Sequence, residues 1–197
     1  MNLRRFEIKR PVPTDPTEYL AKMAAAFTPA ASTATTILAE RLDHTRSIKS
    51  RVFLCGNGGS AANSNHWEND LIYGAAKGGL GGVRAHSLSS NTSVLMCLAN
   101  DTGYENIFSG QLEVLASEGD ILIALSGSGN SPNILRAITT ANSLGMESWV
   151  IVGFDGGKAL ELAKHSIHFP IADMQIAEDL QMVVCHTVTR HLFAPKK

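Results

Sequence analysis

The stretch Cys55-Gly-Asn-Gly-Gly-Ser-Ala-Ala-Asn-Ser-Asn-His66 follows directly on the short apolar run Val52-Phe53-Leu54. Its glycines allow the backbone to turn sharply and to approach a ligand closely. Ser60 then begins a predicted helix, and a helix start offers free backbone N–H groups and the positive end of the helix dipole. The stretch therefore indicates a binding site for an anion, of which phosphate is the commonest at such a turn.

A second stretch has the same design. Asp120 and the apolar run 121–125 predict a buried strand, and Ser126-Gly-Ser-Gly-Asn-Ser131 follows it. Residues 133–144 have the apolar spacing of a helix with Ser131 as its N-cap. An ordinary turn between a strand and a helix needs only one or two such residues, so two plain turns are the weaker explanation. Together the two units offer a ligand four serine hydroxyls, those of Ser60, Ser126, Ser128 and Ser131.

Strand and helix patterns alternate along the chain, as in a parallel sheet covered on both faces. The predicted strands are 51–55, 83–88, 120–126, 148–152 and 166–169. The predicted helices are 17–26, 31–48, 60–73, 92–100, 105–117, 133–144, 158–163 and 176–193. We therefore expect an α/β fold with a doubly wound, mostly parallel five-stranded sheet and an N-terminal helical extension. Ligands of such sheets bind at the carboxyl ends of the strands, where both glycine-rich loops fall.

The composition fits one domain with a sizeable core, because 44% of the 197 residues are hydrophobic and the mean hydropathy is +0.02. We expect this domain to span residues 1–197. Within it, residues 1–50 form an extended arm over 1–15 followed by helices, and residues 51–197 form the α/β core.

Composition also argues against several kinds of partner. The net charge is −1 and no basic stripe is present, which disfavours nucleic acid. No apolar run approaches the roughly 20 residues that span a bilayer, and the first residues lack the apolar part of a signal peptide. Three cysteines without paired spacing suit a reducing compartment, so we expect the cytoplasm. The glycine turns match neither nucleotide-binding fingerprint, so we expect no nucleotide cofactor.

Four motifs in series carry a family resemblance. Cys55-Gly-Asn-Gly-Gly-Ser60, Ala99-Asn-Asp-Thr-Gly-Tyr104, Ser126-Gly-Ser-Gly-Asn-Ser131 and Gly153-Phe-Asp-Gly-Gly-Lys158 occur in the order and spacing of sedoheptulose-7-phosphate isomerases. The chain thus resembles this group of the SIS (sugar isomerase) family from about residue 31 to residue 193. It is also similar to the non-catalytic bacterial SIS protein that binds the replication initiator, so a phosphosugar-binding or regulatory role is the alternative to an enzyme.

The resemblance implies an aldose–ketose isomerase of a phosphorylated sugar, acting through an enediol with a Glu and a His as acid and base. It implies a homotetramer and, in some members, a zinc ion held by two His, that Glu and a Gln. By the same resemblance, Asn57, Gly58 and Gly59 would form the first substrate loop, and Asn100 and Asp101 would contact the sugar. The phosphate loop would comprise Ser126, Gly127, Ser128 and Ser131. Gly127 departs from the Thr usual in the family, which removes one side-chain donor.

Two further positions depart from the pattern. His66 and Asp70 lie four residues apart on one helix face, where the family has His and Glu. Glu178 stands where the family has Gln, eight residues before His186, which matches the catalytic His. A carboxylate shortened by one methylene lies back by on the order of 1 Å, a displacement that can cost about a hundredfold in rate.

Glu178 offers two ways to compensate for the shortened Asp70, and the residues alone leave both open. Glu178 is the base itself in the first alternative, with His186 and Asp70 as the other catalytic residues. In the second, His66, Asp70, Glu178 and His186 converge on a divalent metal ion, for which two imidazoles and two carboxylates suit zinc. Two carboxylates close together without a cation would repel each other, which a metal relieves.

Overall fold

The structure, a computed structural model, describes residues 15–193. Its centre is one sheet of five strands, all parallel, in the order β2-β1-β3-β4-β5. The strands are β1 (Arg51–Gly56), β2 (Arg84–Ser87), β3 (Ile121–Ser126), β4 (Glu147–Val152) and β5 (His165–His168). This sheet confirms the predicted fold class, and each strand lies within one or two residues of its predicted position.

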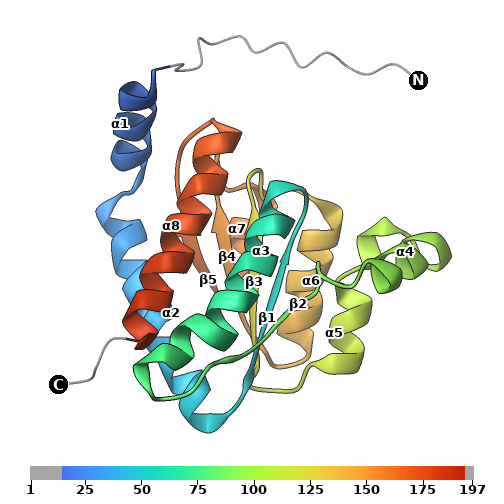
Figure 1. The fold of residues 1–197 in the computed structure, drawn as a ribbon. Coiled ribbons are helices and arrows are strands. Elements are labelled where there is room, and N and C mark those ends of the chain that lie inside the picture. Colours follow the sequence, from blue (N-terminus) through green and yellow to red (C-terminus); the bar gives the residue numbers. More distant parts are fainter. Residues whose placement is uncertain (1–14, 194–197) are drawn as a thin grey trace, which may run out of the picture.

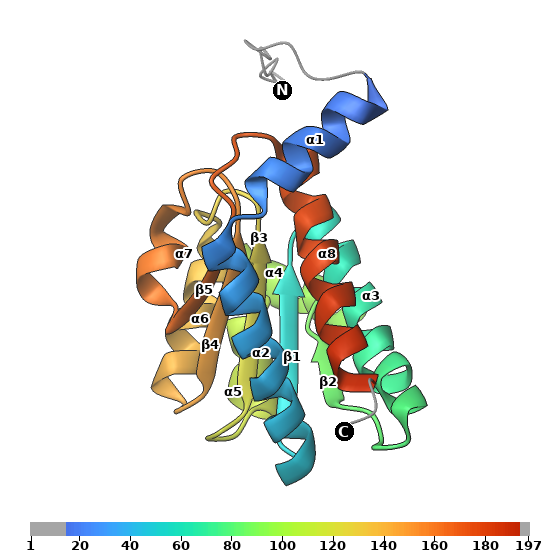
Figure 2. The same cartoon turned by 90° about the vertical axis from the view of Figure 1, so that its left-hand side faces the viewer.

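Helices cover both faces of the sheet (Figures 1 and 2). One face packs against α2 (Pro29–Ile48), α3 (Gly59–Asn69) and α8 (Met174–Phe193). The other face packs against α5 (Ser109–Leu115), α6 (Pro132–Ser143) and α7 (Gly157–Leu162). The N-terminal helix α1 (Pro16–Ala26) lies beside the upper end of α8, and α4 (Thr92–Asp101) lies at the opposite side of the molecule (Figure 1).

The two cores follow from the two-residue period of a strand. In β3, Ile121, Ile123 and Leu125 belong to the core under α2, α3 and α8, whereas Leu122 and Ala124 belong to the core under α5, α6 and α7. Every residue of β3 is buried, which is why its sequence is a continuous apolar run and not an alternating one.

The strand order places a switch in chain direction between β1 and β3. From β1 the chain first crosses to β2 on one side, and it then returns to β3 on the other side of β1. The helices that follow β1 and β3 lie on opposite faces of the sheet, so a crevice opens between the carboxyl ends of these two strands. Gly56 pairs with Leu125 at this edge, so both glycine-rich loops begin side by side.

Two predicted helices differ from the observed elements. The helix predicted over 105–117 is divided into a 3-10 turn, Tyr104–Asn106, and α5, because Ile107 and Phe108 between them are buried in the core. The helix predicted over 60–73 is regular only to Asn69 and then widens into a π-helical turn. The arm predicted over 1–15 lies outside the described residues except for Asp15, whose carboxylate caps α1.

Within residues 15–193, no helix combines the length and the apolar character that crossing a membrane requires.

Asp120 closes the amino end of the sheet. The residue is 5% exposed, and its two carboxylate oxygens accept hydrogen bonds from the backbone N–H groups of Arg51 (2.8 Å) and Ser117 (2.9 Å). One buried carboxylate thus connects the start of β1 to the turn before β3.

Asp120→Ala should lower the free energy of unfolding by about 2–4 kcal/mol, because hydrogen bonds to a charged acceptor contribute about 1.5–3 kcal/mol each. Chemical denaturation measures the change. Glu118→Ala is the matched control: Glu118 is exposed on the same turn, and its replacement should change the free energy by less than about 0.5 kcal/mol. A loss below about 1 kcal/mol for Asp120→Ala would contradict the assignment.

Candidate functional site

A hollow of about 260 Å³ lies at the carboxyl ends of β1 and β3, between the two glycine-rich loops and the start of α8. Most of the residues that line it are serines and glycines, together with one asparagine. The residues that line it are Asn57, Gly58, Ser60, Leu125, Ser126, Gly127, Ser128, Ser131, Met174 and Glu178. Seven of these are among the substrate-binding positions expected from the sequence, and the fold therefore brings the two loops together around one space.

Two serines of the second loop shape the loop and keep a donor for a ligand. Ser126 Oγ accepts the Gly129 N–H (3.0 Å), and Ser128 Oγ accepts the Asn130 N–H (3.3 Å). These bonds use oxygen lone pairs, so each hydroxyl retains its own O–H as a donor.

Ser131 stands at the N-cap of α6, as expected, but its hydroxyl does not cap the helix. Instead the Asn133 side chain accepts the Ile134 N–H at 3.0 Å. Within residues 15–193 the Ser131 hydroxyl makes no hydrogen bond, so it is free for a ligand in the hollow.

Ser60 forms a wall of the hollow and joins two helices. It is buried, and its Oγ accepts a hydrogen bond from Gln181 Nε2 of α8 at 3.1 Å. Asn63 donates to Gln181 Oε1 at 3.0 Å, so a line of polar side chains fastens α3 to α8. Sequence reasoning missed Gln181, whose only signal is a polar residue on the apolar face of a helix.

The segment that begins with the fourth motif, residues 153–159, is hydrogen-bonded to the second loop, residues 126–131. The Gly153 N–H donates to the Gly127 carbonyl (3.0 Å), and the Ala159 N–H donates to the Gly129 carbonyl (3.0 Å). Gly129 has a φ of +66°, and a Cβ there would overlap the Gly156 carbonyl oxygen. A Cβ on Gly127 would instead meet the thioether of Met174. Met174 therefore fills the space that a side chain at position 127 would take.

Asn57 connects the first loop to two other segments. Its side chain exchanges two hydrogen bonds with the Asn133 side chain, at 2.9 and 2.8 Å. Tyr104 donates its hydroxyl to Asn57 Oδ1 at 3.0 Å. Sequence reasoning missed Asn133 and gave Tyr104 no role, although Tyr104 ends one of the four motifs.

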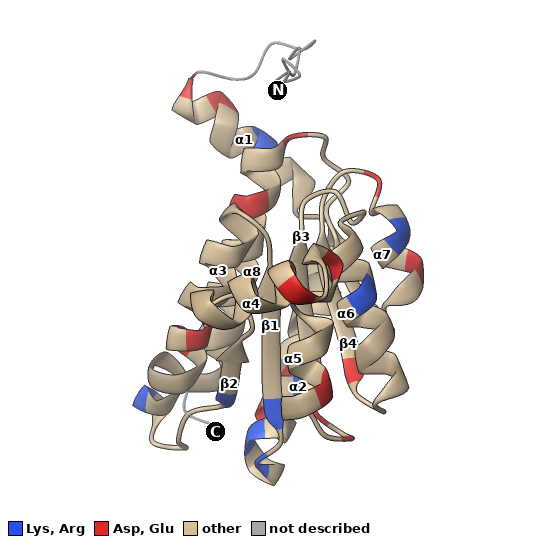
Figure 3. Ribbon diagram, turned by 90° about the vertical axis from the view of Figure 1, so that its right-hand side faces the viewer, with Lys and Arg blue, Asp and Glu red and all other residues tan. Residues whose placement is uncertain are grey.

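Glu178 places a carboxylate in the hollow. Its side chain lies against Gly59 at the start of α3, where a Cβ would overlap it. No Lys or Arg is among the lining residues, and Figure 3 shows such residues instead on α7 and at the amino end of β1. Any anion bound here is held by hydroxyls, amides and the α3 helix start, with Glu178 opposing it.

A second cluster lies farther along the groove between α3 and α8. One ligand atom from each of His66, Asp70, Cys185 and His186 lies within 4.8 Å of every other. The two histidine Nε2 atoms are 3.1 Å apart, and Asp70 Oδ2 lies 3.5 Å from His66 Nε2 and 3.8 Å from His186 Nε2. Tetrahedral zinc with bonds of about 2.0–2.1 Å separates its ligands by about 3.3 Å, so these three residues fit the ion.

A π-helical turn places Asp70 in this cluster. The turn runs from Asp70 to Gly74 and follows α3 without a break. Widened turns of this kind occur frequently at functional sites. The imidazoles are open to solvent, with side-chain exposures of 47% for His66 and 55% for His186.

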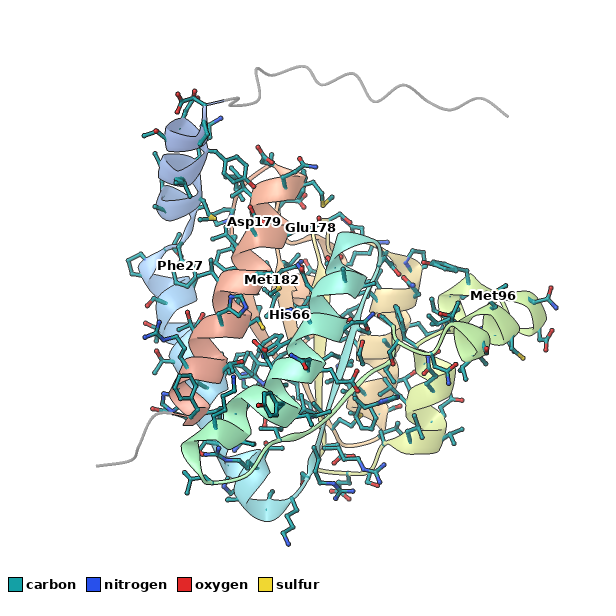
Figure 4. The ribbon with its side chains drawn as sticks, in the orientation of Figure 1. Phe27, His66, Met96, Glu178, Asp179 and Met182 are labelled. Atoms are coloured by element: carbon teal, nitrogen blue, oxygen red, sulfur yellow. The ribbon has the colours of Figure 1, made fainter. Side chains whose placement is uncertain are left out.

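Glu178 does not join the cluster within one chain, contrary to the four-residue set expected from the sequence. It precedes His186 by eight residues on α8, which corresponds to a rise of about 12 Å. Figure 4 shows Glu178 near the upper end of α8 and His66 lower down the groove. The side chains on the two helices thus form two separate groups.

Cys185 is the fourth member of the cluster. Sequence reasoning missed this role, although Cys185 directly precedes His186. It is buried, and burial together with the nearby Asp70 charge raises the pKa of its thiol. The thiol is therefore protonated at neutral pH, unless a bound cation replaces its proton.

Asn100 and Asp101 do not line the hollow. They end α4, where Asn100 Nδ2 donates to Asp101 Oδ1 at 2.7 Å, and this bond and a second from Cys97 hold the pKa of the Asp101 carboxyl below its usual value. Met96 of the same helix lies at the opposite side of the molecule from α8 (Figure 4). Their expected contact with a sugar stays a prediction.

Comparison with known proteins agrees with this geometry. The sequence model of the SIS domain matches residues 17–153. The chain is 39% identical to the phosphoheptose isomerase of Aliarcobacter butzleri over 140 residues, which are 70% of this chain and 72% of that protein. This chain belongs to the SIS domain family. Within that family its curated relatives include a second phosphoheptose isomerase, from Mycobacterium tuberculosis, 38% identical over 151 residues (75% of this chain, 76% of that protein).

A solved SIS structure shows the same arrangement of elements. Phosphoheptose isomerase GmhA from Neisseria gonorrhoeae superimposes with a TM-score of 0.81 at 26% identity, over 89% of this chain and 93% of that chain. This superposition covers a larger share of the chain than residues 17–153 do. The SIS fold predicted from the four motifs is thus confirmed.

Gly129→Ala should lower the free energy of unfolding by at least about 2 kcal/mol. A left-handed backbone costs about 1–2 kcal/mol for a residue with a Cβ, and the overlap with the rigid Gly156 carbonyl adds to it. Gly127→Ala is the matched control and should cost less than about 1 kcal/mol, because the flexible Met174 side chain can rotate away. Chemical denaturation of both variants tests this, and equal losses would show that the support behind Gly129 is not rigid.

Proposed function

We propose that this protein is a phosphosugar aldose–ketose isomerase that acts on sedoheptulose 7-phosphate. The observation that carries the proposal is the hollow between two serine- and glycine-rich loops, in a chain about 39% identical to a protein named phosphoheptose isomerase. A hollow lined by hydroxyls and backbone groups at a helix start suits a phosphate ester.

In this proposal the second loop binds the phosphate. Ser126, Ser128 and Ser131 each have an O–H to donate, and the Gly127 backbone N–H replaces the side-chain donor that the position lacks. The first loop, with Asn57, Gly58, Gly59 and Ser60, closes the other side. Asn100 and Asp101 lie outside the hollow at the end of α4, and in this proposal they contact the sugar hydroxyls where the substrate extends beyond it.

The isomerisation moves a proton between two adjacent carbons, so it needs a base that takes the proton and an acid that protonates the carbonyl oxygen. We assign these roles to Glu178, Asp70 and His186. Glu178 is the carboxylate that lines the hollow itself. His186 lies about 12 Å along α8 from it, and Asp70 lies beside His186 on the turn after α3, so in this proposal both act on the substrate of a second copy.

We further propose a homotetramer in the cytoplasm. The exposed imidazoles of His66 and His186 and the exposed apolar side chains of Ile72 and Tyr73 support a protein contact on this side of the chain. The three cysteines are free, which agrees with a reducing compartment.

The cluster of His66, Asp70, Cys185 and His186 would hold one zinc ion per site. The ion would polarise the carbonyl of the substrate as a Lewis acid. Asp70 and the two imidazoles fit its bond lengths as they stand, and Cys185 would complete the set from the buried side.

The purified protein should convert sedoheptulose 7-phosphate to an aldose phosphate, and His186→Ala should lower kcat by at least about a hundredfold because it removes an acid/base group. The product is measured with a coupled assay. His191→Ala is the matched control, since His191 is an exposed histidine on the same helix. Asp70→Asn and Glu178→Gln then identify the base, because the variant that lacks the base should show the larger fall in kcat of the two.

Binding of the sugar phosphate without turnover, with or without added zinc, would contradict the enzyme. That outcome favours the alternative of a phosphosugar-binding protein. A wild-type chain that neither binds nor converts the compound would contradict both roles.

Co²⁺, which substitutes for zinc and absorbs light, should bind the cluster in a one-to-one ratio and show a near-ultraviolet charge-transfer band if a thiolate is a ligand. Cys185→Ser should abolish the band and leave the ion bound by the other three residues, whereas His186→Ala should weaken binding at least about tenfold. Cys97→Ser, which changes a cysteine outside the cluster, should leave the spectrum unchanged. A band that persists in Cys185→Ser would exclude this cysteine as a ligand.

A further inference from the structure

Three side chains form a hydrogen-bonded chain at the mouth of the hollow. Asn133 is fully buried at the start of α6, Asn57 lies in the first loop, and Tyr104 begins the 3-10 turn after α4. Tyr104 bonds to Asn57, and Asn57 bonds to Asn133 through both groups of its amide. Segments that are far apart in the sequence therefore meet at Asn57.

The direction of these side-chain hydrogen bonds follows from one backbone group. The Ile134 N–H can only donate, so the atom of Asn133 that faces it at 3.0 Å is the side-chain oxygen. The same oxygen accepts from Asn57 Nδ2 at 2.9 Å, and Asn133 Nδ2 donates back to Asn57 Oδ1 at 2.8 Å. The orientation of the Asn57 amide is thus set by the helix start of α6.

The Asn57 side chain has one N–H group left to donate to a ligand. Its oxygen accepts two hydrogen bonds, from Asn133 and from the Tyr104 hydroxyl, which uses both lone pairs. Its nitrogen has two N–H groups, of which one is given to Asn133. Among residues 15–193 no acceptor takes the other N–H, and Asn57 lines the hollow.

We propose that Tyr104 is a positioning residue that holds the Asn57 amide so that its free N–H donates to the phosphate ester in the hollow. The proposal rests on the proposed phosphate site. The Tyr104 hydroxyl donates to the second lone pair of Asn57 Oδ1. This bond restrains the Asn57 amide from rotating out of its pairing with Asn133. Tyr104 is 57% exposed, so its hydroxyl adds little to the core and its role can be separated from stability.

Tyr104→Phe should weaken the binding of inorganic phosphate about fivefold, the usual worth of one neutral hydrogen bond, and should raise KM for sedoheptulose 7-phosphate similarly. Because Tyr104 does not touch the reacting carbons in this assignment, kcat should stay within about twofold. Calorimetry gives the phosphate affinity, and the melting temperature reports any general loss of structure.

The matched control is Tyr73→Phe. Tyr73 is also exposed, and its ring contacts the Lys77 ammonium, an interaction that phenylalanine preserves. Its replacement should leave phosphate affinity unchanged. A double-mutant cycle then asks whether Tyr104 acts through Asn57: Asn57→Ala should weaken phosphate binding more than Tyr104→Phe does, and adding Tyr104→Phe to it should cause no further loss.

Each outcome decides the proposal. Unchanged phosphate affinity in Tyr104→Phe overturns it, and so does a further loss in the Asn57→Ala background, since Tyr104 would then act elsewhere. A fall in kcat and melting temperature without a change in KM shows a structural role only. Wild-type protein that binds phosphate but does not turn over the sugar contradicts the isomerase and leaves the Tyr104 test intact, whereas absence of phosphate binding overturns the positioning role as well.

Discussion

The parallel pairing of β1 with β3 is the constraint on which the rest of the site depends. Gly56 and Leu125 are partners at the carboxyl edge, so the loops that follow them start at neighbouring positions although about 70 residues separate them. The helices after these loops diverge to opposite faces of the sheet. Their first turns therefore border one hollow, and the pairs Asn57–Asn133 and Ser60–Gln181 fasten its walls.

The hollow is built almost without formal charge. Serine hydroxyls, one amide and a helix start are the donors that the hollow offers to an anion, and the lining residues include a carboxylate but no Lys or Arg. Neutral donors fixed by the fold require little reorganisation when the ligand binds. At Gly127 the loop offers only backbone groups, because Met174 of α8 occupies the space that a side chain there would need.

Helix α8 serves two groups of side chains at once. Its first two turns bring Met174 and Glu178 to the hollow, and its later turns bring Cys185 and His186 to the cluster with α3. The groove between α3 and α8 therefore carries two imidazoles, a thiol and the Asp70 carboxylate at one end, and Glu178 with the serine hydroxyls at the other. In the function proposed above, a metal ion and the phosphate would therefore bind at separate places on the chain.

The amino-acid sequence by itself determined the five strands, the parallel sheet and both glycine-rich loops, because each depends on local patterning of a few consecutive residues. The SIS family followed separately, from the resemblance of four motifs in series. It could not place Glu178 relative to His186, since a helix pattern shows which face residues share but not what that face meets. Only the tertiary structure separated Glu178 from the cluster, added Cys185 to it and joined Tyr104 to Asn57. These are contacts between elements far apart in the chain, where packing decides the distances and spacing does not.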